Sequence, residues 1–271
     1  MAVTDDSKYL APAAVCAADV LLAVARSETR LNAGQLSTLT GHNRSLVYRV
    51  AKSLVSRNFL REHELQGSVW FRLGPAAGEV GGAYQRAIPF QESIRHQMSQ
   101  LSDRYGETVS VGQLEGSEVR YLMREEGRNS VVALSHVGKR LPAHATAIGK
   151  ALLAGLDWSE TEKLFSGETA LRQLTSSTIH TISDLQIDLA QVRERGYAVE
   201  YGEVVQGRCC LAAAIPGFDV FGSRIAISIS MPQPRFDEEY EQIAAELLRC
   251  ASELRDDVRD RRDLGGNESL A

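Results

Sequence analysis

The apolar residues of this 271-residue chain follow mostly helical spacing up to Gly106, and a spacing of two begins at Thr108; this change limits the fold more than any other feature. Apolar residues follow helical spacing over 12–26, 33–40 and 43–57, and again over the run that ends at Gly106. From Thr108 the period becomes two, which is typical of strands with one buried face. We therefore expect a mainly α N-terminal domain, then a C-terminal α/β domain with a mixed, mostly antiparallel sheet.

The expected domain boundaries follow from this change of period. The glycines at 74, 78, 81 and 82 suggest a hinge before the helical run that ends at Gly106. We expect four segments: an N-terminal domain over 1–80, a linker helix over 81–106, a C-terminal domain over 107–262 and a disordered tail over 263–271.

The charge of the chain is distributed unevenly. Residues 1–80 carry nine Lys and Arg against seven Asp and Glu, whereas the remainder carries 21 against 28. Residues 41–61 hold five basic residues and no acid. Such a split indicates a nucleic-acid-facing module joined to a domain of another kind.

The first three helices and the residues after them predict a winged helix-turn-helix. Gly41 separates the second helix from the third, and 61–73 reads as a hairpin around Gln66 and Gly67. The third helix is narrow enough to enter the major groove of double-stranded DNA. The alternative is a small helical bundle whose basic face is merely solvated.

Six residues of the third helix and its end are the candidate DNA contacts. Arg44, Ser45 and Tyr48 lie near the start of the helix, where contact with base edges is expected. Tyr48 could equally belong to the core. Arg49, Lys52 and Arg57 suit phosphates.

Two expectations concern the apolar faces of the N-terminal half. The inward stripe of the first helix is expected at Val15, Ala18, Leu22 and Ala25, and Leu36 and Leu39 are expected inward in the second. A second group of apolar residues carries more apolar surface than one winged helix can bury. This surface predicts at least a dimer. This set contains Val20, Leu21, Val24, Ile88, Ile94, Met98 and Leu101.

The C-terminal domain is expected to contain six strands and three main helices. The strands are expected at 108–114, 117–125, 130–137, 197–201, 209–215 and 223–230. One helix follows Pro142 over 145–155, and a second runs from an N-cap at Ser183 to Gly196. A final amphipathic helix is expected over 236–260.

Two of these strands have one large apolar face and one face of small residues. In CCLAAAI, Cys209, Leu211, Ala213 and Ile215 point away from Cys210, Ala212 and Ala214. In SRIAISIS, the three isoleucines oppose Ala226, Ser228 and Ser230. A small, partly polar face can leave room for a ligand and orient it through hydroxyls. It could instead allow a helix to pack closely.

Several separated motifs, in order, resemble the IclR-type transcriptional regulators. They are HNRSLVYRVAKSLVSRNFL and FRLGPAAGEVG in the first domain, and GKRLPAHATAIGKALLAG, RGYAVEYGEVVQGRCCLAAAI and AISISMP in the second. Two departures, Ala143 and the AAI at 213–215, bear on pocket shape. The resemblance implies a winged helix-turn-helix, a linker helix and a GAF-like domain that binds a small organic effector.

The resemblance also implies site residues and partners. Members that bind acids use positions matching Ala147, Ile148, Cys210, Ser228 and Ser230. The first two open a helix, where backbone N–H groups can face a carboxylate. The implied partners are a near-palindromic DNA operator, a small-molecule effector and a second copy, as a homodimer or a dimer of dimers.

Two further residues near this helix keep open interpretations. His144 could pair with an acid or cap the turn, and the cap is favoured. Glu203 matches a common acid of the family, and a surface role is as plausible as an effector contact.

Other functions have little support in the sequence. No catalytic motif, metal spacing or phosphate loop is present, so we expect no catalytic residue, metal or cofactor, and no enzyme activity. The acidic N-terminus, the lack of a long apolar run and four cysteines without a CxxC favour the cytoplasm and no membrane contact. The alternatives are a sensory module without DNA binding and, less favoured, an enzyme on the second domain.

Overall fold

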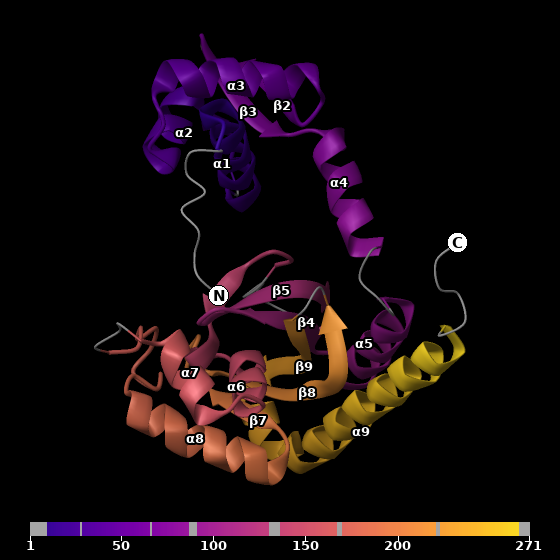
Figure 1. The fold of residues 1–271 in the computed structure, drawn as a ribbon. Helices are drawn as coiled ribbons and strands as arrows, with labels where there is room; N and C mark the ends of the chain where they lie inside the picture. The colour runs from indigo at the N-terminus through magenta and orange to yellow at the C-terminus, as the bar shows by residue number, and fades with distance from the viewer. Residues whose placement is uncertain are drawn as a thin grey trace. The chain divides into compact units, whose positions relative to one another are not determined.

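The structure, a computed structural model, describes residues 10–27, 29–65, 67–86, 91–129, 136–166, 170–220 and 223–265. The chain divides into two compact units, Met1–Ala87 and Ile88–Ala271 (Figure 1). Each unit has its own hydrophobic core, and each is described by itself below.

The N-terminal unit is a winged helix-turn-helix, which confirms the predicted fold of this domain. Its helices are α1 (Pro12–Arg26), α2 (Ala33–Thr40) and α3 (Arg44–Ser56), and its wing is the hairpin of β2 (Leu60–Leu65) and β3 (Ser68–Leu73). Gly41 ends α2 at φ 72°, and Gly67 forms the wing turn at φ 73°, both in the left-handed region that glycine tolerates. A short strand not expected from the sequence, β1 (Leu31–Asn32), pairs with β3.

The expected inward stripe of α1 is wrong. The buried residues of this helix are Cys16, Val20 and Val24, whereas Leu22 is 48% exposed. Nearly every residue of α1 is apolar, so periodicity does not define a face, and packing against α3 and β3 decides which side is buried. In α2, Leu36 is buried as expected, but Leu39 is 64% exposed.

The apolar residues from which a dimer was predicted do not form a free surface. Val20 and Val24 lie in the core of the N-terminal unit, and Ile94, Met98 and Leu101 lie in the core of the C-terminal unit. Leu21 packs against the first core, and Ile88 lies outside the described residues. The burial of these residues therefore gives no support to a dimer.

In place of the single linker helix expected at 81–106, the described residues form the end of one helix and the whole of another. α4 (Pro75–Arg86) begins six residues before the expected boundary and contains Gly78, Gly81 and Gly82. α5 (Gln91–Tyr105) packs on the sheet of the C-terminal unit. Nothing lies within 4 Å of where a Cβ on Gly78 or Gly81 would stand, so these glycines occupy an open helix surface.

The C-terminal unit is an α/β domain built on a six-stranded sheet of order β6-β5-β4-β9-β8-β7. The strands are β4 (Thr108–Glu115), β5 (Glu118–Glu125), β6 (Arg140–Pro142), β7 (Ala198–Tyr201), β8 (Arg208–Val220) and β9 (Ser223–Pro232). Every strand pair that the structure describes is antiparallel. Most of the strand expected over 130–137 lies outside the described residues.

Helices cover both faces of this sheet (Figure 1). α5 and α9 (Gln233–Gly265) pack on the large apolar face, which carries Leu211, Ile227 and Ile229. α6 (Ala147–Ala154) and α8 (Ile182–Arg195) pack on the opposite face, which carries Ala212 and Ala226. The alternation read from the two strands is therefore confirmed.

The sequence predicted one end of α8 correctly and the other end wrongly. α8 ends at Gly196 with φ 82°, as expected, but its N-cap is Thr181 and not Ser183. The Thr181 Oγ1 accepts a hydrogen bond from the Asp184 N–H at 3.1 Å. α7 (Trp158–Leu164) and the 3₁₀ turn at Ala143–Ala145 were not expected.

Gly149 in α6 should not tolerate a side chain, whereas Gly78 in α4 should. A Cβ on Gly149 would lie 2.1 Å from the backbone oxygen of Ala143, while one on Gly78 meets nothing within 4 Å. Gly149→Ala should therefore lower the thermal midpoint of the C-terminal unit. Gly78→Ala should raise the stability of α4 by about 0.5–1 kcal/mol through helix propensity. Calorimetry checks both, and a Gly149→Ala variant as stable as the parent would contradict the close approach.

Candidate functional site

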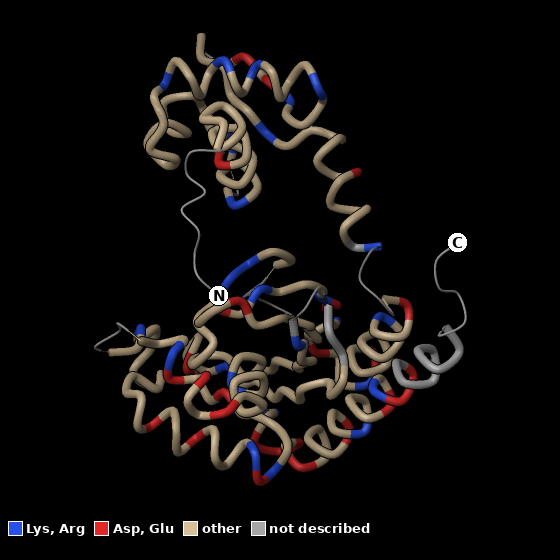
Figure 2. Tube along the Cα trace, in the orientation of Figure 1, with Lys and Arg blue, Asp and Glu red and all other residues tan. Residues whose placement is uncertain are grey.

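The predicted DNA-contacting residues lie on α3 and at its C-terminal end. Arg44, Ser45, Tyr48, Arg49, Lys52 and Arg57 are all exposed along α3 and at its end. Tyr48 is 42% exposed, so it is a surface residue and not part of the core. Figure 2 shows basic residues, in blue, spread over α3 and the hairpin.

The start of α3 lies beside the tip of the wing. Arg44, Ser45 and Tyr48 line a surface depression together with Gly67 and Ser68 of the wing turn. The Asn43 side chain accepts a hydrogen bond from the Ser45 N–H at 2.8 Å and caps the helix. The residues expected to reach base edges are therefore held at an ordered helix start.

Lys52 has a partner that the acid-free stretch did not indicate. Its ammonium nitrogen lies 2.8 Å from both carboxylate oxygens of Glu62, which is the first acid after that stretch and lies on β2. The carboxylate raises the pKa of Lys52 mainly through this hydrogen bond. A phosphate contact at Lys52 would have to compete with Glu62.

The small-residue face of the C-terminal sheet is used in two ways along its length. Ala212 and Ala226 lie under α6 and belong to the same apolar core as Ile148 and Leu152. Two residues farther along each strand, on the same face, Cys210 and Ser228 face a cavity instead. Close helix packing and an open space, which the sequence left as alternatives, therefore occur side by side on one face.

This cavity brings together all five residues expected at an effector site: Ala147, Ile148, Cys210, Ser228 and Ser230. It has about 580 Å³ of empty volume, a figure that includes open space at its mouth. The rest of its described lining consists of Thr108, Ser110, Tyr121, Arg124, Leu141, Thr146, Glu200, Val204, Val205 and Arg208.

Strand register explains why the polar residues converge there. Ser230 on β9 pairs with Thr108 on β4 and with Cys210 on β8, and Ser228 pairs with Ser110. Residues opposite each other on neighbouring strands share a face, so the hydroxyls and the thiol form one floor. Burial raises the pKa of the Cys210 thiol well above its ordinary value, which leaves it a neutral group and not a nucleophile.

The N-terminus of α6 supplies backbone donors to the same cavity. Thr146 is the N-cap, and its Oγ1 accepts the Gly149 N–H at 3.0 Å. Among the described hydrogen bonds, none uses the N–H of Ala147 or Ile148. Such first-turn groups, together with the helix dipole, favour an anionic ligand.

Charged residues of the cavity were not found from the sequence. They are Arg124, Glu200 and Arg208. Arg208 lies two residues before Cys210, so the period-two argument that selected Cys210 could have selected it as well. Glu200 and Arg124 required the strand order, which no local pattern indicates. Burial raises the pKa of Glu200, whose Oε1 accepts the N–H groups of Glu203 and Val204.

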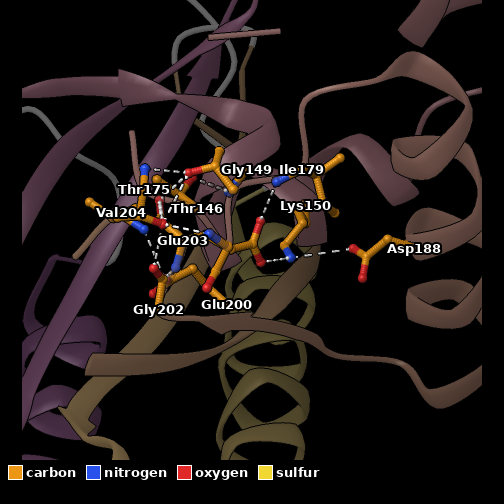
Figure 3. A network of polar contacts seen from close by, with 12 residues as sticks. Thr146, Gly149, Lys150, Thr175, Ile179, Asp188, Glu200, Gly202, Glu203 and Val204 are labelled. Carbon is orange, nitrogen blue, oxygen red and sulfur yellow. Dashed lines mark hydrogen bonds and ion pairs between the residues drawn. The ribbon is translucent and has the colours of Figure 1, made fainter. Parts of the chain in front are cut away.

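A buried ion pair fixes two walls of the cavity to each other (Figure 3). The Lys150 ammonium of α6 lies 2.6 Å from the Glu203 carboxylate, and Asp188 of α8 lies 3.5 Å away on its other side. Lys150 is 1% exposed. Burial raises the pKa of Glu203, and the nearby Lys150 charge opposes that rise. Glu203 therefore ties α6 to the loop that carries Val204 and Val205.

The structure shows the surroundings of Glu203 and His144, for which the sequence allowed two roles each. Glu203 is buried beside Lys150 and is not among the cavity-lining residues, so it is neither a surface residue nor positioned to contact a ligand there. His144 is buried, with its Nε2 3.0 Å from the Arg172 backbone oxygen and its ring edge-on to Phe165.

The chain matches two sequence profiles from one family. "IclR helix-turn-helix domain" matches residues 14–64, and "Bacterial transcriptional regulator IclR C-terminal" matches residues 83–255. Among curated relatives, the HTH-type transcriptional regulator XynR of Escherichia coli K12 is 32% identical over 212 residues, which is 78% of this chain and 82% of XynR. The repressor AllR of the same organism is 34% identical over 206 residues, 76% of this chain and 74% of AllR.

Solved structures match across both units. A transcriptional regulator from Rhodococcus sp. RHA1 has a TM-score of 0.78 at 25% identity and covers 93% of this chain and 99% of its own. An IclR homolog from Microbacterium hydrocarbonoxydans, solved with 4-hydroxybenzoate, has a TM-score of 0.74 at 22% identity, over 92% of this chain and 99% of its own.

The winged helix and the cavity-bearing domain thus define a DNA-binding transcriptional regulator with a C-terminal ligand-binding domain. More specifically, the chain belongs to the IclR family. Within the described part of the chain, no helix combines the length and apolar character needed to span a membrane.

The buried pair of Lys150 and Glu203 should be costly to break from one side. Lys150→Met leaves the Glu203 carboxylate buried without its cation and should lower the free energy of unfolding of the C-terminal unit by about 3–5 kcal/mol. Adding Glu203→Gln should restore most of the loss. Thermal or urea unfolding checks this.

The matched control is the exposed pair on the other unit. Lys52→Met breaks an ion pair of similar distance and should leave the thermal midpoint essentially unchanged, because water screens both partners. Equal, small effects at Lys150 and Lys52 would contradict the role given to the buried pair.

Proposed function

We propose that operator binding by this regulator is controlled by a small organic acid bound in the C-terminal cavity. The observation that carries the proposal is the convergence of Ala147, Ile148, Cys210, Ser228 and Ser230 on that cavity. One end of the site offers helix N–H groups to a carboxylate, and the floor offers hydroxyls to a polar substituent.

Chemistry at this site favours an acid over a neutral ligand. The N–H groups of Ala147 and Ile148 lie in the first turn of α6, which carries partial positive charge. The 4-hydroxybenzoate of the Microbacterium homolog is an aromatic acid, which fits the same class. The effector can shift DNA binding only if its affinity differs between the binding-competent and incompetent states.

On the DNA side, we propose that α3 enters the major groove. Arg44, Ser45 and Tyr48 are assigned to base edges, with Arg44 meeting a phosphate as well, and Arg49, Lys52 and Arg57 are assigned to phosphates. A homodimer or a dimer of dimers would place two such helices on a near-palindromic operator, about 34 Å apart.

We further propose that this regulator acts in the cytoplasm and has no enzyme activity. The curated relatives are transcriptional regulators, which supports the absence of catalysis. A sensory module without DNA binding is less well supported, because the six predicted DNA contacts are all exposed and Arg44, Ser45 and Tyr48 lie beside the wing turn.

DNA affinity should depend steeply on salt. If Arg44, Arg49, Lys52 and Arg57 each meet a phosphate in two subunits, about eight contacts form, and log K should fall with log salt at a slope of about −7. Arg49→Ala should weaken binding to all sequences alike, whereas Arg44→Ala should also relax base preference. Fluorescence anisotropy against salt measures this. A slope shallower than about −2 would exclude this binding mode.

Ser228 should separate effector response from DNA binding. Ser228→Leu fills the cavity floor, whereas Ser228→Ala removes only the hydroxyl. The Ala variant should lose about 1 kcal/mol of effector-binding free energy, and more if a polar group of the ligand is left unpaired. Operator binding without effector should survive both changes, because α3 lies in the other unit. The effector response should fail in the Leu variant and shift to higher concentration in the Ala variant. An unchanged response in Ser228→Leu, in operator binding titrated with the acid, would place the site elsewhere.

A further inference from the structure

Arg208 of β8 lines the cavity and is bound to its floor. Its Nη2 donates to the backbone oxygen of Ser230 at 3.1 Å and to the Ser230 Oγ at 3.3 Å. Ser230 is one of the five residues expected to contact the effector. The Arg208 side chain is 11% exposed, and a guanidinium group is charged at any physiological pH. A positive charge is therefore held at the floor on which the effector is proposed to lie.

Arg208 also faces a buried carboxylate that it does not reach. Its Nη2 is 3.9 Å from the Glu107 Oε2, which is close enough for an ion pair but too long for a hydrogen bond. The Arg208 Nε is buried and has no hydrogen-bond partner among the described residues. The Glu107 side chain is 1% exposed, and a carboxylate can accept about four hydrogen bonds. A small shift of Arg208 toward Glu107 would therefore form a charge-assisted hydrogen bond that is now missing.

Arg235 of α9 connects the Glu107 carboxylate to the end of α5. Its Nη1 lies 2.8 Å from the Glu107 Oε1 and donates to the Tyr105 backbone oxygen at 2.9 Å. Tyr105 is the last residue of α5, where backbone oxygens lack partners within the helix. The Nε and Nη2 of Arg235 bind Glu239, one turn later in α9, at 3.0 and 2.7 Å. Because Arg235 is anchored in this way, a movement of Glu107 acts on the end of α5.

α5 is the first helix of the C-terminal unit in chain order. The boundary between the two units falls between Ala87 and Ile88, so the chain runs from the DNA-binding unit into α5 and then into β4. Within its own unit, α5 packs on β4, β5 and α9. The contacts of Arg208, Glu107 and Arg235 therefore connect the cavity floor to the helix that follows the DNA-binding unit.

We propose that a bound acid competes with Glu107 for the guanidinium of Arg208, and that this competition transmits effector binding to α5. The inference rests on the proposed function, because it needs an anionic effector in the cavity. The acid draws Arg208 toward the floor and away from Glu107. The Glu107 carboxylate then depends more on Arg235, whose contact with the end of α5 tightens. The acid thus has a different affinity for each position of Arg208, which is the condition for control.

Glu107→Gln removes the competing carboxylate and is the first test. Titration calorimetry on the full chain with benzoate, 4-hydroxybenzoate, butyrate and hexanoate identifies the acid that binds most tightly. The Gln variant should bind that acid about threefold more tightly or better, because Arg208 no longer has a second carboxylate. A purely structural role of Glu107 would instead weaken acid binding.

The response of DNA binding should nevertheless fail in Glu107→Gln. Fluorescence anisotropy measures it with DNA selected by the full chain from a random-sequence pool. At saturating acid, the DNA affinity of the parent should change by about fivefold or more, and that of the variant by less than about twofold.

Arg235→Gln separates transmission from binding. Its acid affinity should stay within about threefold of the parent, because Arg235 does not line the cavity, but its response should fall like that of Glu107→Gln. Arg235→Lys, which keeps a charge beside Glu107, should retain part of the response. Arg104→Gln is the matched control. It breaks a different contact between α5 and α9, the exposed pair of Arg104 and Glu246 at 2.8 Å, and should leave affinity and response unchanged.

Three outcomes would overturn the inference and leave the proposed function intact. They are acid binding by Glu107→Gln that is unchanged or weaker, a full response at saturating acid in Arg235→Gln, and an equal loss of response in Arg104→Gln. If Glu107→Gln does not fold, Arg235→Gln and Arg235→Lys decide. If none of the four acids binds the parent, or if bound acid leaves its DNA affinity unchanged, the proposed function itself is contradicted, and the inference falls with it.

Discussion

The buried contact between the Lys150 ammonium and the Glu203 carboxylate is the interaction on which the cavity depends. Lys150 belongs to α6, whose first turn forms one wall, and Glu203 lies in the loop whose Val204 and Val205 form another. Glu200 binds the same loop through the Glu203 and Val204 N–H groups. Since a one-sided loss leaves a buried charge unpaired, the contact between the two walls is costly to break from either side. Figure 3 shows this network around the loop.

Small residues determine where the cavity can open. Gly149 lets the 3₁₀ turn approach α6, and Ala212 and Ala226 let α6 approach the sheet. The same strands then carry Cys210, Ser228 and Ser230 past the end of the helix, where space remains. One strand face thus serves both close packing and ligand space, and the helix dipole is directed at the boundary between them. The described lining of the cavity comes from α6 and from all six strands of the sheet.

The sequence predicted features that depend on local period and failed where tertiary packing decides. Alternation in β8 and β9 correctly separated Leu211 and Ile227 from Ala212 and Ser228, because one residue step changes the face. The face of α1 was wrong, since an apolar helix has no periodic signal. Arg124 was missed because its place depends on strand order, and Glu62 was missed because the hairpin register brings it to Lys52. The apolar surface expected to form a dimer was also wrong. Ile94 and Met98 are buried in the core of the C-terminal unit, which begins before Thr108, where the spacing of apolar residues changes.

Hydrogen–deuterium exchange on the full chain, with and without a small organic acid that titration calorimetry shows to bind, tests the central claim most directly. An acid held at the α6 N-terminus should slow exchange of the amides of Ala147 and Ile148, for which no acceptor is found among the described hydrogen bonds. Peptides covering 144–150 should gain protection together with those covering 226–230. Binding that protects other segments and leaves 144–150 unchanged would contradict the account.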